Sequence, residues 1–97
     1  MTENDWTWIG LRILDIRRQR KISLKELADR TGITKGHLSN IEHNQKHVSL
    51  EALTDVVSVL DVSMDYIVRG IRPQRDTSGL VFHSDDELEK TYLLTEE

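Results

Sequence analysis

Cysteine is absent from the 97-residue sequence, and proline and phenylalanine each occur only once. Without cysteine, the chain can form neither a disulfide framework nor a thiolate metal site. No stretch approaches the roughly 18 apolar residues that a membrane-spanning helix needs. Residues 1–10 also lack the basic segment and the long apolar run of a signal peptide. We therefore expect a cytoplasmic protein.

Motifs for catalysis are missing as well. The chain has no Gly-rich phosphate loop and no nucleophile motif. His37, His43 and His47 lie close together in the sequence. However, the first two are six residues apart, which places them on different faces of a helix, and no carboxylate has a matching helical spacing. We expect neither an enzyme nor a bound cofactor or metal.

Charge is distributed unevenly along the chain. The net charge is −4, yet residues 1–48 hold nine Lys or Arg against six acidic residues. Residues 49–97 hold four basic and eleven acidic residues. A charged partner responds to the field within about 8 Å at physiological salt, so the local charge matters more than the average. The net acidity therefore does not exclude nucleic acid, although a chance scatter of charge remains the alternative.

Apolar residues at helical spacing predict an all-α protein. From Trp8, the residues Ile9, Ile13 and Ile16 recur on one face of a first helix, which ends in a basic cluster. The segment 23–32 reads as a second helix, with a capping-box pattern at its start and Gly32 at its exit.

A third helix is predicted over residues 35–43, with Thr34 as its N-cap and Leu38 and Ile41 facing inward. The other face of this helix is polar: Lys35, His37, Ser39, Asn40 and His43. A fourth helix runs from the cap Ser49 to Leu60, and a short fifth one ends at Gly70.

The chain changes character after Gly70. Residues 71–79 contain the only proline and read as a linker. The apolar run 80–82 predicts either a strand or a docking segment. A second capping-box pattern, at Ser84 and Glu87, predicts a further helix through Leu93.

The segment 23–43 is a helix, a glycine-containing turn and a short amphipathic helix. A DNA major groove, about 12 Å wide, admits one such helix, and its short polar side chains can reach base edges. A plain helical hairpin within a bundle would show the same amphipathicity. Periodicity alone leaves both interpretations open.

The residues themselves resemble a known family. The stretches that carry the resemblance are Ile9-Gly10, Arg17, Ile22–Ala28, Thr31–Ile33, Leu38–Glu42, Ser49–Leu53 and Leu60–Ser63. They resemble the Cro/repressor-type (XRE-like) helix-turn-helix family over about residues 9–70. The resemblance implies a five-helix, lambda-repressor-like domain over residues 6–70 that binds double-stranded DNA as a homodimer. Residues 71–97 would be a linker and an acidic extension for dimerisation or partner docking.

The resemblance also implies which residues contact DNA. The base-reading positions are Thr34, Lys35, Gly36, His37, Ser39 and Asn40. Asn40 can bond an adenine edge with two hydrogen bonds, and Lys35 suits guanine acceptors. Gly36 departs from the family, because a side chain often reads a base there. Leu24 also departs, because the family often has Gln at that position, so Leu24 is left out of the site.

Phosphate contacts would come mainly from the loop after the reading helix and would position the protein without specifying sequence. The expected phosphate residues are Arg18, Ser23, His43, Asn44, Gln45, Lys46 and His47. The family resemblance further implies a structural salt bridge between Arg17 and Glu42, which would fix the angle of the reading helix.

A second protein is another predicted partner. Leu11 and Leu14 lie off the buried face of the first helix, and together with Trp6 and Trp8 they could form an apolar patch. One interpretation is that the C-terminal extension folds back and covers this patch. The other is that the patch or the extension docks a second protein or subunit.

The resemblance implies a transcription regulator of bacterial or phage origin, most simply a dimeric repressor on an inverted-repeat operator. One alternative is an antitoxin that also represses its own operon. Another is the controller protein of a restriction–modification system. A neighbouring toxin gene or methyltransferase gene would discriminate among these three.

Overall fold

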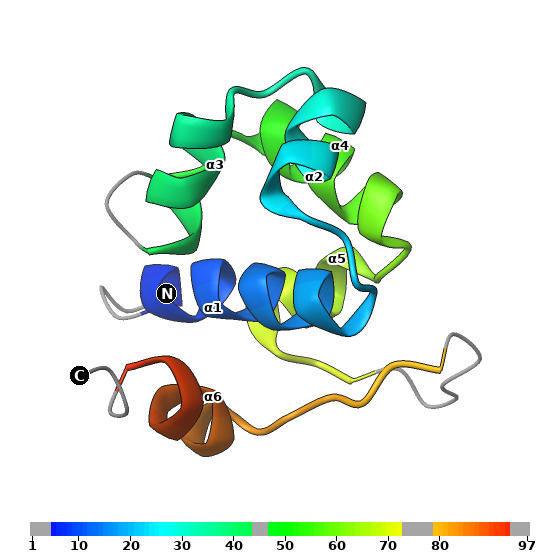
Figure 1. Cartoon of the computed structure of the whole chain (residues 1–97). Coiled ribbons are helices and arrows are strands. Elements are labelled where there is room, and N and C mark those ends of the chain that lie inside the picture. The colour runs from blue at the N-terminus through cyan, green and yellow to red at the C-terminus, as the bar shows by residue number, and fades with distance from the viewer. Residues whose placement is uncertain (1–4, 44–46, 73–78, 94–97) are drawn as a thin grey trace.

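The computed structural model describes residues 5–43, 47–72 and 79–93, with side chains from Trp8 onward. In these residues the fold is all-α, which confirms the predicted class (Figure 1). The helices are α1 (Asp5–Gln19), α2 (Leu24–Thr31), α3 (Lys35–Glu42), α4 (Leu50–Leu60), α5 (Met64–Arg69) and α6 (Asp85–Tyr92). None of the helices in the described segments is long and apolar enough to cross a membrane.

Serine and threonine caps set where the helices begin. From α2 to α6, the residue before each helix accepts a hydrogen bond from the backbone N–H three positions later. These caps are Ser23, Thr34, Ser49, Ser63 and Ser84. A side-chain cap satisfies one of the four N–H groups that a helix start leaves unpaired.

The two predicted capping boxes differ. At Ser84 the box is complete, because the Glu87 side chain also accepts from the Ser84 backbone N–H at 2.8 Å. At Ser23 the side chain of Glu26 instead pairs with Arg30 at 2.8 Å. The first helix also differs from the prediction, since it begins at Asp5 rather than near Trp8.

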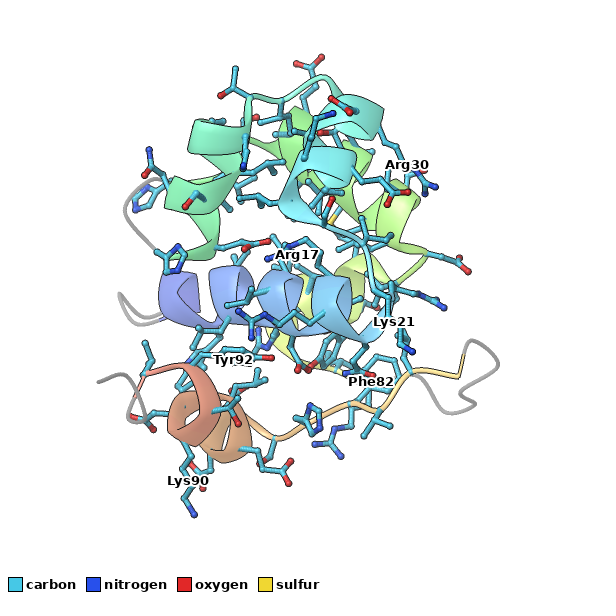
Figure 2. All side chains as sticks on the ribbon, viewed as in Figure 1. Arg17, Lys21, Arg30, Phe82, Lys90 and Tyr92 are labelled. Atoms are coloured by element: carbon cyan, nitrogen blue, oxygen red, sulfur yellow. The ribbon has the colours of Figure 1, made fainter. Side chains whose placement is uncertain are left out.

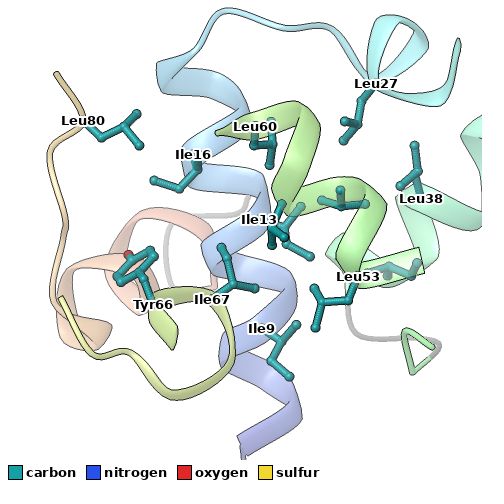
Figure 3. Packing of buried hydrophobic residues seen from close by; sticks show 13 residues of the cluster. Ile9, Ile13, Ile16, Leu27, Leu38, Leu53, Leu60, Tyr66, Ile67 and Leu80 are labelled. Carbon is teal, nitrogen blue, oxygen red and sulfur yellow. The ribbon is translucent and has the colours of Figure 1, made fainter. Parts of the chain in front are cut away.

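The core forms where α1 packs against α3, α4 and α5 (Figure 3). Ile13 and Ile16 of α1 are completely buried there, as the helical spacing predicts. The other buried members are Ile9, Leu27, Leu38, Ile41, Leu53, Val56, Val57, Leu60, Tyr66, Ile67 and Leu80. Burying such side chains contributes about 1.5–3 kcal/mol each, so this cluster is the main source of stability.

Residues 79–93 return along α1, and we refer to them as the C-terminal arm. In Figure 1 α6 lies on the side of α1 opposite to α3. The run 80–82 forms no strand in the described structure. Leu80 instead joins the core, and the ring of Phe82 packs edge-on against Tyr66 with 4.7 Å between the ring centroids.

The arm covers the apolar patch predicted on the first helix. Leu11 and Leu14 are buried, as is Leu88 of α6. An open patch containing Leu11 and Leu14 is therefore wrong for this structure, because the chain's own C-terminal arm occupies the place of a partner. Trp8 is half-buried, and the side chain of Trp6 lies outside the described residues.

Arg12 links α1 to two other elements. One of its terminal nitrogens donates to the backbone carbonyl oxygen of Ile67 near the end of α5, at 3.2 Å. The other donates to both carboxylate oxygens of Asp85 at 3.0 and 2.9 Å. A Cβ atom at Gly70 would lie 2.7 Å from this guanidinium, and Gly70 also has a φ of +75°. Both constraints favour glycine there.

Asp15 is the second buried charge on this side of α1. It accepts hydrogen bonds from His83 at 2.8 Å, from the Tyr92 hydroxyl at 3.1 Å and from Gln19 at 3.1 Å. Gln19 also exchanges two hydrogen bonds with the backbone of Val81, at 2.6 and 2.7 Å. The arm is therefore attached to α1 by buried leucines and by directional polar contacts.

Candidate nucleic-acid interface

A tight turn joins α2 to α3 and sets their relative orientation. Gly32 ends α2 in the left-handed conformation, with φ of +77°, and its N–H donates to the carbonyl oxygen of Ala28 at 2.9 Å. The Thr31 hydroxyl donates to Leu27 and accepts from the Ile33 N–H at 3.3 Å. The helix, turn and helix predicted from the sequence are thus present.

The inner face of α3 anchors it to the core. Leu38 is completely buried, and Ile41 and Glu42 are almost completely so. The six predicted base-reading residues lie outside this buried face: Thr34, Lys35 and Gly36 are exposed, and His37, Ser39 and Asn40 are half-buried. The structure therefore brings these six residues together at the surface along one short helix.

The ion pair between Arg17 and Glu42 is present and has two-pronged geometry. Arg17 Nε donates to Glu42 Oε2 at 2.7 Å, and Arg17 Nη2 donates to Oε1 at 3.1 Å. Arg17 Nη1 also donates to the carbonyl oxygen of Ile22 at 3.0 Å. In Figure 2 Arg17 lies between α1 and α3. The pair thus ties the end of α3 and the turn before α2 to the same helix.

Gly36 leaves a gap in the outer face of α3. A Cβ atom built at this position would meet no heavy atom within 4 Å, and the backbone has no positive φ. Nothing in the fold therefore demands glycine at this position. Its effect is on the surface, where the backbone of α3 is open to close approach by a ligand.

The formal charges of α2 and α3 cancel. The two helices carry three basic and three acidic residues. On α2, Lys25 pairs with Asp29 at 3.1 Å and Arg30 pairs with Glu26 at 2.8 Å. Lys35 makes no ion pair within the described residues, so it is the fixed positive charge on the outer face of α3.

The predicted phosphate residues are only partly brought together. Ser23 caps α2 and His43 caps the end of α3, and both are exposed. His47 is also exposed. Asn44, Gln45 and Lys46 lie outside the described residues.

Arg18 lies elsewhere. Its guanidinium carbon is 5.5 Å from the centroid of the Tyr92 ring, on the side of α1 that faces the arm (Figure 2). The structure therefore does not group Arg18 with α3, because an aromatic face of the arm holds it. Leu24, which sequence reasoning left out of the site, is half-buried against the core.

No group of three or more His, Asp or Glu residues in the described part of the chain could hold a metal ion. The three neighbouring histidines differ in their surroundings instead. His37 is half-buried on the outer face of α3, whereas the ring of His43 turns back onto the last turn of that helix.

Sequence reasoning missed the roles of Arg12 and Asp15. Both are at least 95% buried, yet they are charged residues on a helix whose predicted inner face is apolar. Apart from Gln19, which lies one turn after Asp15, their partners lie 55 to 77 positions further along the chain, so no local pattern indicates them. Charged residues are rarely fully buried unless they are paired, so the charges beside Leu11 and Leu14 favour an open face rather than a covered one.

The matching family model is described as helix-turn-helix and covers residues 13–67. The regulator SinR of Bacillus subtilis is 46% identical over 57 residues, which is 58% of this chain and 51% of SinR. This chain thus spans about half the length of that relative. The residues that the family model matches contain the turn and both helices around it.

Several solved structures are similar, and three of them illustrate the range. SinR in complex with DNA has a TM-score of 0.58 and 42% identity over 61% of this chain and 95% of that one. The restriction–modification controller C.AhdI of Aeromonas hydrophila has a TM-score of 0.58 and 25% identity over 61% and 89%. The complex of SinR with SinI has a TM-score of 0.62 and 32% identity over 86% and 89%.

The family model covers more than half of the sequence. It contains α2, the turn and α3 with its exposed outer face. The predicted resemblance is confirmed. This chain belongs to the helix-turn-helix family, in its Cro/repressor type.

Proposed function

We propose that this chain is a sequence-specific transcription regulator that inserts α3 into the major groove of operator DNA. One observation carries the proposal. The outer face of α3 presents six polar or small residues to solvent, while Leu38, Ile41 and Glu42 fix its inner face. A short helix of this kind fits the groove with its side chains at base edges. The similarity to SinR bound to DNA supports the same conclusion.

Within this proposal, the DNA-binding unit spans residues 6–70. Thr34, Lys35, His37, Ser39 and Asn40 read bases, and Gly36 allows close approach. Ser23, His43, His47 and the segment 44–46 contact phosphates. Arg18 becomes a phosphate contact only if it leaves Tyr92. Two copies would present two α3 helices about 34 Å apart, which predicts a dimer on an inverted repeat.

Selection of bound duplexes from a random pool, followed by footprinting, tests this proposal. We expect an inverted repeat with half-sites about one helical turn apart. Lys35→Ala should weaken binding of the selected duplex by about fivefold or more, because one Lys contact to guanine contributes about 1–3 kcal/mol of discrimination. Asn40→Ala should lose specific binding while binding to unrelated DNA persists.

Lys90→Ala is the matched control, because it also removes one exposed lysine but from α6 (Figure 2). It should leave the affinity unchanged within about twofold, since its helix lies on the far side of α1. Equal losses for Lys35→Ala and Lys90→Ala would contradict the assigned face. An unchanged footprint for Asn40→Ala would contradict the assigned reading residues.

A controller of a restriction–modification system is the second candidate, and the similarity to C.AhdI favours it. It would activate rather than repress, so a promoter fusion measured with and without the protein separates the two. An antitoxin function stays a prediction that an adjacent toxin gene would support. A relative solved in complex with SinI also supports a protein partner for this chain. Trp6, Trp8 or the arm would then provide the surface, since Leu11 and Leu14 are covered.

A further inference from the structure

The ring of His43 is held in one orientation at the end of α3. Its Nδ1 atom lies 2.8 Å from the carbonyl oxygen of Ser39, one turn earlier in the helix. The backbone N–H of His43 donates to the same oxygen at 3.0 Å. The side chain is exposed, so the ring lies on the last turn of the helix with its far edge toward solvent.

This contact fixes the tautomer of the neutral ring. A carbonyl oxygen carries no proton, so Nδ1 must be the nitrogen that donates. The other nitrogen, Nε2, then carries a lone pair and can only accept while the ring is neutral. Within the described residues, Nε2 makes no hydrogen bond. A phosphate oxygen also only accepts, so neutral His43 has nothing to offer it. Protonation at Nε2 turns the same edge into a charged donor.

Arg17 and Glu42 are charged residues beside the end of α3, and they pair with each other at 2.7 Å, so together they add no net charge there. His47 is the other titratable side chain described in the segment that follows α3. Because the formal charges of α2 and α3 cancel, a proton on His43 would add substantially to the attraction for DNA.

We propose that His43 contacts a DNA phosphate as an imidazolium, so that binding of the operator takes up a proton at the end of the reading helix. The inference rests on the proposed DNA-binding function and adds that the affinity for the operator depends on pH. Affinity should then fall as the pH rises through the range where imidazole titrates. By linkage, bound DNA in turn should hold the proton on His43.

The test measures the Kd of the selected duplex between pH 6 and 8.5 at constant ionic strength. For one linked proton, the Kd should rise by up to about tenfold per pH unit on the alkaline side, while the footprint stays the same. Calorimetry at pH 7 in phosphate and in Tris buffer gives a second readout. The difference between the two binding enthalpies measures the protons taken up, which should be clearly above zero for the wild-type chain.

His43→Gln retains a donor without a titratable charge, so it should lose most of the pH dependence and most of the proton uptake. His83→Gln is the matched control that should retain both, because His83 lies in the arm and contacts Asp15 rather than α3. A wild-type Kd that is independent of pH, or equal proton uptake in His43→Gln and wild type, would overturn the inference alone. If no duplex is selected or bound at any pH, the proposed DNA-binding function fails and the inference falls with it.

Discussion

The two sides of α1 are held by different kinds of contact. Toward α3, α4 and α5, the helix buries Ile9, Ile13 and Ile16. Two arginines add polar contacts on this side: Arg17 pairs with Glu42, and Arg20 donates to the backbone carbonyl oxygens of Leu60 and Asp61 at 3.0 Å. Toward the arm, the helix buries Leu11 and Leu14. On the same side, polar side chains form hydrogen bonds with residues of the arm: Arg12, Asp15 and Gln19. One side is thus mainly an apolar core, and the other combines buried leucines with a network of hydrogen bonds and ion pairs.

The two kinds of contact should respond differently to mutation and to pH. Apolar packing is lost in proportion to the volume removed and is insensitive to pH. A polar network depends on each donor and acceptor, and a buried group left alone costs about 1–3 kcal/mol. We therefore expect the core side to control the reading helix and the arm side to be a separable, pH-sensitive clamp on the opposite face of α1.

The largest expected effect is on the core side. Glu42→Ala should destabilise the fold by about 3–5 kcal/mol, because it leaves the mostly buried guanidinium of Arg17 without its partner. The melting temperature should fall far more than for Lys35→Ala or Asn40→Ala, whose side chains lie on the outer face of α3. Thermal unfolding followed by circular dichroism measures all three, and equal melting temperatures would contradict the role of the pair.

A smaller effect is expected from the apolar centre of the arm. Leu88→Ala should destabilise the protein by about 2 kcal/mol, near the lower end for a buried leucine, because α6 can relax toward α1. Hydrogen exchange should show faster exchange in α6 and unchanged protection in α3, with the duplex affinity preserved. Leu93→Ala, at an exposed position, is the matched control. Equal loss of protection in α3 and α6 would show that the two sides of α1 are not separable.

The smallest expected effect is a change in the pH dependence of the protein's stability, which arises from the polar contacts of the arm. Burial raises the pKa of Tyr92 to about 12, and the charge of Asp15 acts in the same direction. The folded protein therefore keeps this hydroxyl protonated while the unfolded chain ionises near pH 10. The resulting stabilisation is complete below pH 10 and is lost as the pH rises through about 12.

Tyr92→Phe should cost about 1 kcal/mol at neutral pH, for one lost hydrogen bond to Asp15. It should also show a weaker decline in stability between pH 10 and 12, measured by urea unfolding at pH 9 and 11. Burial also raises the pKa of Tyr66 to about 12, so Tyr66 accounts for the decline in stability that remains in the variant. The same decline in both proteins would place Tyr92 outside the clamp.

Local sequence patterns predicted the helices well, because the contacts that begin and end each helix lie within a few residues. Each Ser or Thr cap bonds an N–H group only three residues away, and Gly32 and Gly70 end helices by their own left-handed conformation. The exception is the start of α1, which begins at Asp5, three residues before the predicted start. The sequence has Asn, a favoured N-cap residue, at position 4, and the prediction followed the apolar spacing instead of this signal.

The candidate site was predictable to the extent that it lies on one helix. The spacing of Leu38 and Ile41 defines the inner face of α3, and therefore also the outer face that carries Lys35 and Asn40. The resemblance added the Arg17–Glu42 pair, which no spacing indicates. It also assigned Arg18 to the phosphate residues, which stays a prediction. The structure places this side chain beside Tyr92, which lies outside the family pattern over residues 9–70.

The sequence by itself determined the helices, the turn at Gly32 and the polar face of α3, because each depends on contacts within a few residues. Only the tertiary structure decided what covers Leu11 and Leu14, and why Arg12 and Asp15 are buried. Their partners, from Ile67 to Tyr92, are brought back by the chain after more than 50 residues. A buried charge is stable only when its partners surround it, and such partners are known only once the whole chain has folded.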